Sequence, residues 1–162
     1  MPRKTKMMTD FEAHERSSGR DPRQTLRGTR ALLRSYREIL WRAGLEEQSA
    51  EEIGALSEGQ ALLAHLLAPG QAISPQNQSY AQAAALMRHS LAQVARYPGN
   101  GALYYEILDN SYFKETPVTD DTLWLQLHIE RSSFYQRKQE AVLLYALCCE
   151  RVMGMVSQSD QL

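Results

Sequence analysis

Hydrophobic residues recur every three or four positions along most of this chain, which is the period of a helix with one buried face. Leu26, Leu33 and Leu40 repeat at intervals of seven within residues 25–43. Residues 80–97 follow the same rule, with apolar side chains at Tyr80, Ala84, Met87, Leu91 and Val94. The pattern predicts a helix over each segment, and only short ambiguous runs resemble strands. We therefore expect an all-α fold, a helical bundle.

Capping and breaking residues divide the rest of the chain. Ser49 followed by Glu52 matches a capping box, in which both side chains satisfy the first N–H groups of a helix over 49–67. Residues 69–78 contain two prolines and a glycine and predict a linker loop. The run YPGNG at 97–101 ends the helix before it, because proline and glycine do not continue a helix.

The most specific stretch lies between residues 119 and 141, where only a tight turn separates two predicted helices. Thr119 is a good N-cap, since its hydroxyl can accept an N–H bond from the first turn. The first helix buries Leu123, Trp124 and Leu127, and residues 128–130 form the turn, with Ile129 against the core. This order is typical of a helix-turn-helix, whose second helix fits the major groove of DNA.

The second helix is expected to begin near Arg131, with its apolar stripe at Phe134, Ala141, Tyr145, Cys148 and Val152. With Phe134 inward, the helical period turns hydrogen-bonding side chains outward. Arginine can bind guanine and glutamine can bind adenine through paired hydrogen bonds, and basic side chains on the flanks can contact phosphates. The candidate DNA-binding residues are Arg131, Ser132, Ser133, Tyr135, Gln136, Arg137, Lys138 and Gln139.

These elements predict two helical lobes joined by a loop, with a helix over 102–113 before the motif. The expected parts are a disordered basic tail (1–23), an N-terminal helical lobe (24–68), a linker loop (69–78), a C-terminal helix-turn-helix lobe (79–156) and a disordered tail (157–162). Heptad spacing in the helices over 25–43 and 80–97 fits packing within one bundle and leaves a coiled-coil homodimer open.

Charge is unevenly distributed, although the net charge is −1. Residues 1–37 contain ten basic and four acidic side chains, whereas residues 38–80 contain one and six. The basic tail fits a solubilising segment or an arm on a phosphate backbone. Arg27, Arg30, Arg34 and Arg37 share one face of the first predicted helix, which fits a solvated face or a ridge toward phosphates.

The sequence predicts no disulfide, metal-binding or catalytic chemistry. Cys148 and Cys149 are adjacent and the four histidines are scattered, so the spacing predicts neither a disulfide nor a metal site. No carboxylate pair, nucleophile triad or phosphate-binding loop has a usable spacing, so we expect neither an enzyme nor a cofactor. We also expect no membrane span and no signal peptide, which leaves the cytoplasm as the location.

The C-terminal half resembles the RinA/ArpU-like phage and prophage transcription regulators. The resemblance covers residues 25–150 and is most specific in LYYEILDNSYF (103–113) and in ERSSFYQ (130–136) with Glu140-Ala141. It implies a lobe like region 4 of bacterial σ factors, binding to double-stranded promoter DNA and control of late phage genes together with host RNA polymerase. Glu130 and Gln136 depart from the family's serine and its common basic residue.

Three other readings stay open beside this one. The motif fits an ordinary helical hairpin with a polar outer face. It also fits a small terminase-like packaging protein, which would form a large oligomer. A helical interaction module without DNA would use Leu143 and Leu147 as an exposed patch.

Overall fold

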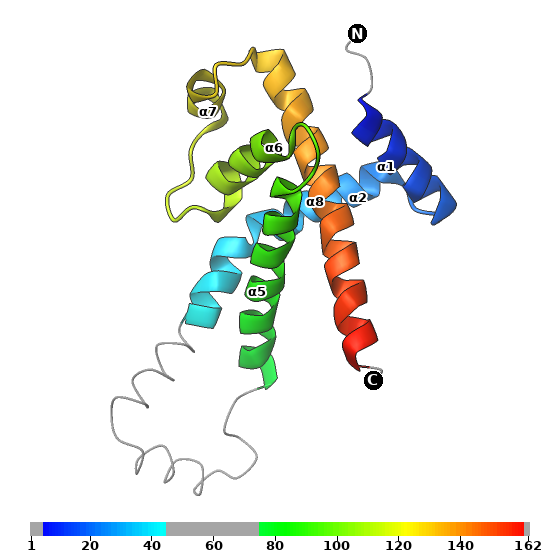
Figure 1. Ribbon diagram of the computed structural model, residues 1–162. Helices are drawn as coiled ribbons and strands as arrows, with labels where there is room; N and C mark the ends of the chain where they lie inside the picture. Colours follow the sequence, from blue (N-terminus) through cyan, green and yellow to red (C-terminus); the bar gives the residue numbers. More distant parts are fainter. Residues whose placement is uncertain (1–4, 45–74, 161–162) are drawn as a thin grey trace, which may run out of the picture. The chain divides into compact units, whose positions relative to one another are not determined.

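The computed structural model describes residues 5–44 and 75–160 and, of these, the side chains of 5–44 and 80–154. The described part of the chain is helical and contains no strand, which confirms the all-α fold (Figure 1). Its elements are α1 (Lys6–Ser17), α2 (Pro22–Arg34), α5 (Pro75–Ala95), α6 (Gly101–Leu108), the π-helix η1 (Asp109–Phe113), α7 (Asp120–Gln126) and α8 (Arg131–Asp160), with residues 36–44 also helical. The predicted helix over 49–67 lies outside the described residues.

The chain divides into two compact units, and the division differs from the two expected lobes. The first unit combines residues 1–35 with 86–162, and the second contains residues 36–85. The N-terminal helices therefore belong with the C-terminal ones, because α1 and α2 both pack on α8.

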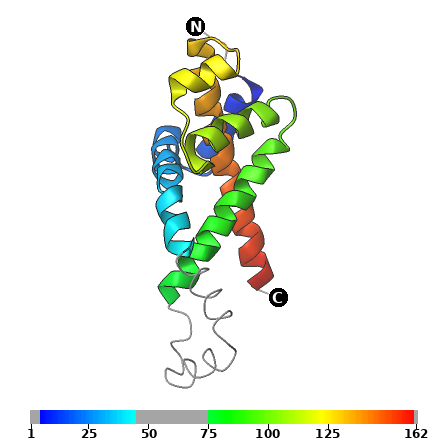
Figure 2. The same ribbon diagram turned by 90° about the vertical axis from the view of Figure 1, so that its left-hand side faces the viewer.

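In the first unit, α8 carries α6 and α7 on one side of its N-terminal part and α1 on another (Figures 1 and 2). The main apolar cluster forms where α1, α2, α5 and α6 meet the middle of α8. Its buried members are Met7, Phe11, Leu33, Leu91, Val94, Tyr104, Leu108, Tyr112 and the five residues 141–145. This burial of apolar surface is the main source of stability for the unit.

The expected disordered tail over 1–23 is wrong for most of its length, since residues 6–17 form α1. Thr5 caps the helix by accepting the Met8 N–H at 3.3 Å. Met7 and Phe11, four residues apart, are buried in the main cluster. Glu15, one turn further, is also buried and receives the Arg20 guanidinium at 3.4 Å and the Thr25 hydroxyl at 2.9 Å. Two apolar side chains on one face are enough to hold α1 as an ordered helix, because α8 supplies the opposite apolar surface.

Helix boundaries also differ from expectation at three places. The single helix expected over 25–43 is interrupted at Ser35, the C-cap of α2. Residues 75–78 of the expected linker are helical and belong to α5, and the rest of that linker lies outside the described residues. Residues 157–160 of the expected C-terminal tail continue α8.

The predicted break at YPGNG is confirmed between α5 and α6. Gly99 has φ +87°, a conformation that glycine adopts without strain. A Cβ on Gly101 would lie 2.8 Å from the Ala95 carbonyl oxygen, so no other residue fits there without a shift. The turn thereby brings α6 close to the end of α5.

The second unit contains helical residues 36–44 and the first half of α5. Arg42 joins the two segments, since its guanidinium donates to the Tyr80 hydroxyl at 2.9 Å and lies 5.1 Å from the ring centroid. Tyr36, Ala43 and Ala84 are buried. Among the described helices of both units, none has the length and apolarity needed to cross a membrane.

Candidate nucleic-acid interface

Helix α7 is short, begins where the sequence predicts and leads into α8 through four residues. The Thr119 hydroxyl accepts the Thr122 N–H at 3.3 Å, which confirms the predicted N-cap. Residues 127–130 separate α7 from α8, and the Phe134 N–H already bonds to the Glu130 carbonyl at 2.8 Å. Two helices joined by a tight turn are therefore present at the predicted place.

The turn after α7 is a Schellman motif, in which two N–H groups return to the last turn of the helix. Ile129 donates to the Trp124 carbonyl and His128 to the Leu125 carbonyl, both at 3.2 Å. His128 has φ +57°, the left-handed conformation that this motif requires after the C-cap. Glycine is the usual residue at this position, so the chain makes a glycine-type turn with a histidine.

A small apolar cluster, here called the corner cluster, holds α7 against α8 and α6. It consists of the fully buried Ile107, Leu123 and Phe134. Trp124, Leu127 and Ile129 pack against it as partly buried neighbours. The predicted inward phase of Phe134 and the role of Ile129 in the turn are both confirmed. Because Phe134 is inward, the side chains next to it on the first turns of α8 are directed outward.

An exposed polar row opens α8. We use this name for Arg131, Ser132, Ser133 and Tyr135, all of which are solvent-exposed. The Arg131 guanidinium lies 5.8 Å from the centroid of the Tyr135 ring, and this ring packs edge-on against Phe134 with centroids 5.5 Å apart. These stacked contacts restrict Arg131 and Tyr135 while leaving the guanidinium hydrogen-bond donors open to a partner.

Arg137 and Gln136 are engaged within the protein by Glu140, which sequence reasoning did not single out. Glu140 is fully buried and lies 3.0 Å from the Arg137 guanidinium. The Tyr104 hydroxyl donates to the same carboxylate at 2.5 Å, and the Gln136 amide donates to its other oxygen at 3.3 Å. Burial opposes the charge of Arg137, but the bonds to Glu140 outweigh it and raise the Arg137 pKa. A buried carboxylate thus ties α8 to α6.

Lys138 is also engaged internally. Its ammonium lies 2.7 Å from the Asp120 carboxylate at the start of α7 and 5.4 Å from the centroid of the Tyr112 ring. Only 16% of its side chain is exposed. Gln139 is half-buried. Of the eight candidate residues, the structure therefore leaves the exposed polar row most accessible and gives Arg137 and Lys138 structural partners.

The prediction of an exposed leucine patch, made for an interaction module, is wrong. Leu143 is 2% exposed and lies in the main cluster, and Leu147 packs against that cluster as a partly buried side chain. The two cysteines next in sequence are also partly buried. Burial raises the pKa of Cys148 to about 11, so this thiol stays protonated and unreactive near neutral pH.

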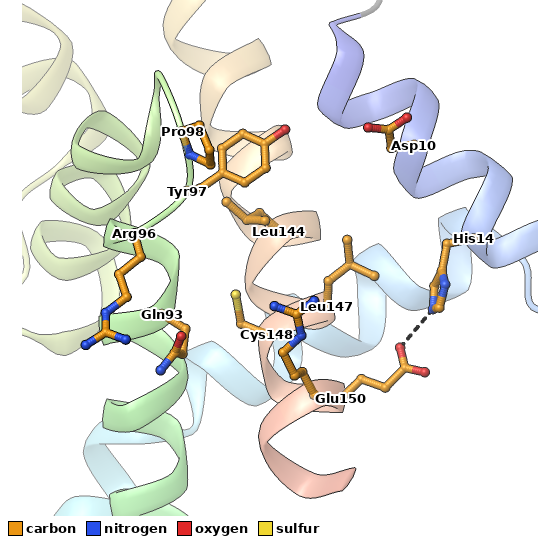
Figure 3. Close-up of a pocket in the computed structure, with 11 residues that line it drawn as sticks. Asp10, His14, Gln93, Arg96, Tyr97, Pro98, Leu144, Leu147, Cys148 and Glu150 are labelled. Carbon is orange, nitrogen blue, oxygen red and sulfur yellow. Dashed lines mark hydrogen bonds and ion pairs between the residues drawn. The ribbon is translucent and has the colours of Figure 1, made fainter. Parts of the chain in front are cut away.

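A cavity of about 710 Å³ lies between α1, α8 and the C-terminal end of α5 (Figure 3). Its apolar lining includes Tyr97 and Leu144. At the rim, Glu150 accepts bonds from His14 at 3.1 Å and from Arg20 at 3.0 Å. Glu150 is thus paired with two basic side chains, and Asp10, Arg96 and Arg151 also line the cavity.

In the described part of the chain, no group of three or more His, Cys, Asp or Glu side chains could hold a metal ion. The resemblance to the RinA/ArpU-like regulators stays a prediction, because comparison of the chain with family models, curated proteins and solved structures finds no match.

Proposed function

We propose that this protein is a sequence-specific DNA-binding transcription regulator that uses α7 and α8 as a helix-turn-helix. The observation that carries the proposal is the exposed polar row at the first turns of α8. Its side chains project from a long helix that the corner cluster and Glu140 fix in place. A recognition helix needs this combination of a rigid joint and free hydrogen-bonding groups at its N-terminal end.

The contacts divide the candidate residues into two groups with different roles. Arg131 is the best candidate for reading a base, since its guanidinium is exposed and can bind guanine O6 and N7 together. Ser132, Ser133 and Tyr135 can bind bases or phosphates beside it. Arg137 and Lys138 contribute positive charge from the flank while mainly stabilising α8 through Glu140 and Asp120.

The cellular role that we propose comes from the resemblance to the RinA/ArpU-like regulators. A helix of this kind on a σ-like lobe fits a regulator that binds promoter DNA of phage or prophage genes in the bacterial cytoplasm, next to host RNA polymerase. The net charge of −1 does not oppose such a role, because the affinity for DNA depends on the basic side chains that contact phosphates and not on the charge of the whole chain.

The proposal is tested by selecting bound duplexes from a random pool, at two salt concentrations and with or without bacterial RNA polymerase. We expect one short motif to be enriched at both salt concentrations. Arg131→Ala should lose about 1–3 kcal/mol of discrimination at one base position. Arg16→Ala, which removes an exposed arginine from α1, is the matched control and should select the parent's motif. No enriched motif under any condition would overturn the proposal.

A change of motif must be separated from a change of fold. Arg131→Ala should unfold with the parent's free energy within about 0.5 kcal/mol, because exposed side chains contribute little to stability. If Arg131→Ala folds normally and still selects the parent's motif with the same preference at every position, Arg131 does not read a base.

A further inference from the structure

Helix α2 carries a row of arginines that the candidate interface does not use. Arg23, Arg27, Arg30 and Arg34 are spaced by four, three and four residues, which places them on one face of the helix. We call this set the arginine row. Arg23, Arg27 and Arg34 are exposed and Arg30 is half-buried. The helix contains no aspartate or glutamate that could neutralise the row.

The row differs from several other arginines in the described part of the chain, each of which has a carboxylate partner. Those pairs are Arg16 with Glu12, Arg20 with Glu15 and Glu150, Arg42 with Glu38, and Arg137 with Glu140. By contrast, no described carboxylate forms an ion pair with the four guanidinium groups of α2. Four like charges on one helical face cost stability when no anion is near. An external polyanion would remove this cost.

The packing of α2 on α8 leaves the arginine row outside the buried contact between the two helices. Leu26 and Leu33 pack α2 into the main cluster beside residues 141–145 of α8. Around the axis of α2, the arginine positions lie about 40–100° from the line of Leu26 and Leu33. Helix α2 crosses behind α8 and begins near α1 (Figures 1 and 2). The row therefore lies on a flank of α2, outside the line of contact that buries Leu26 and Leu33.

The distances along the helices suit one duplex. The midpoint of residues 131–139 precedes the midpoint of residues 141–145, which belong to the same apolar cluster as Leu33 of α2, by about 8 positions, or roughly 12 Å at 1.5 Å per residue. The row itself extends over 11 positions, or about 16 Å. Both lengths are smaller than the roughly 34 Å of one turn of DNA, so one duplex can reach both surfaces.

We propose that the arginine row of α2 is a second DNA contact, which binds the phosphate backbone beside the segment read by α8. This inference rests on the proposed function. Guanidinium groups bind phosphate oxygens through paired, charge-assisted hydrogen bonds. Because phosphates are the same at every base pair, the row strengthens binding to all sequences and does not select among them.

The test compares the parent with a triple variant, Arg23→Gln with Arg27→Gln and Arg34→Gln, on the selected duplex and on a random duplex. Each lost phosphate contact should lower the slope of log affinity against log salt by about 0.9. The triple variant should therefore bind both duplexes about 100-fold more weakly at 0.1 M salt, with its site preference unchanged. Arg30 is kept because it is half-buried and its replacement could disturb packing.

A second triple variant controls for net charge. Arg16→Gln, Arg96→Gln and Arg151→Gln remove the same charge from exposed positions on α1, directly after α5 and on α8. The control should keep the parent's salt slope within about one unit. Equal loss in the two triples, or an unchanged slope in the α2 triple, would overturn the inference.

The same measurements separate this inference from the proposed function. If the parent selects a motif that depends on Arg131 while the α2 triple binds like the parent, only the arginine row is refuted. If the parent binds no duplex at all, both are refuted. Thermal unfolding of both triples confirms that the changes in affinity are not losses of fold.

Discussion

The two apolar clusters of the first unit differ in how far apart their members lie in the sequence. The corner cluster collects Ile107, Leu123 and Phe134 from a short stretch of chain. The main cluster joins Met7 and Phe11 to residues 141–145 at the other end of the chain. The local period of apolar residues can predict the corner cluster, because each of its contacts joins elements that are close in the sequence.

The difference bears on function, because each cluster fixes a different part of the proposed interface. Only three fully buried side chains form the corner cluster, which holds α7 and the first turns of α8. The main cluster is larger and holds α2, and with it the arginine row, against α8. The proposed base reading therefore depends on the small corner cluster, whereas the proposed backbone contact depends on the main cluster.

The largest expected effect comes from emptying the corner cluster. Phe134→Ala should lower the free energy of unfolding by about 3–5 kcal/mol, since Phe134 is fully buried where α7 meets α8. The measurement is chemical denaturation followed by circular dichroism. Leu125→Ala is the control, because Leu125 is 60% exposed on α7 and should cost less than about 1 kcal/mol. Equal stability of the two variants would mean that the corner is not packed as described.

A comparable or slightly smaller effect is expected at the far end of the main cluster. Phe11→Ala should cost about 3–4 kcal/mol, because Phe11 is fully buried, although a helix near the chain end can partly relax into the space. Its neighbour Ala13 is exposed, so Ala13→Ser serves as the control and should melt like the parent. If Phe11→Ala melts at the parent's temperature, Phe11 is not packed in the main cluster, and the prediction of a disordered tail would be correct after all.

An intermediate effect is expected for the hydrogen bond that joins α6 to α8. Tyr104→Phe removes the hydroxyl bound to the buried Glu140 and should cost about 1.5–3 kcal/mol near neutral pH. Burial, followed by the bond to Glu140, raises the pKa of Tyr104 to about 12. The protonated Tyr104 hydroxyl therefore makes its full contribution to the free energy of unfolding below pH 10, the pKa of unfolded tyrosine. This contribution is lost as the pH rises toward 12.

The pH dependence gives a readout that a simple packing defect would not give. Urea unfolding of the parent and of Tyr104→Phe from about pH 8 to about pH 11.5 should show a gap in stability that shrinks above pH 10. Other tyrosines and lysines titrate in both proteins and cancel in the difference. A gap that stays constant over this range would show that the hydroxyl does not reach Glu140 as a proton donor.

Much of the fold could be predicted because its signals are local. The N-cap at Thr119, the start of α8 at Arg131 and the inward phase of Phe134 depend only on neighbouring residues, and all three are confirmed. Helix α1 was missed because Met7 and Phe11 are its only fully apolar buried positions. Their burial depends on α8, more than 120 residues later, which no local window includes.

The two helices that carry the candidate site could be predicted in their places, but the contacts among the site's side chains could not. Helical phase identified the outward side chains of α8 without showing that Glu140 would hold Arg137. One signal was available, since Glu140 lies on the buried side of α8 beside Ala141, and a buried acid needs a basic partner. The pairing of Lys138 with Asp120 crosses two helices and could not be predicted from either.

The smallest expected effect has the opposite sign and tests the turn between the two helices. His128 has φ +57°, which costs a residue with a Cβ about 1 kcal/mol or more, whereas glycine adopts it freely. Glycine also gains entropy in the unfolded chain, which offsets part of the benefit. His128→Gly should therefore stabilise the protein by about 0.5 kcal/mol, seen as a rise of about 1–2 °C in melting temperature.

His128→Ala separates the conformation from the loss of the imidazole. Alanine keeps the Cβ, so it should not stabilise the protein, although it removes the same ring. If both variants are stabilised equally, the ring itself is unfavourable and the backbone is not strained. If His128→Gly is destabilised by about 1 kcal/mol, the residue is in an ordinary helical conformation, where glycine is costly. The turn would then not be a Schellman motif, and α7 would meet α8 at a different angle from the one that directs Arg131 outward.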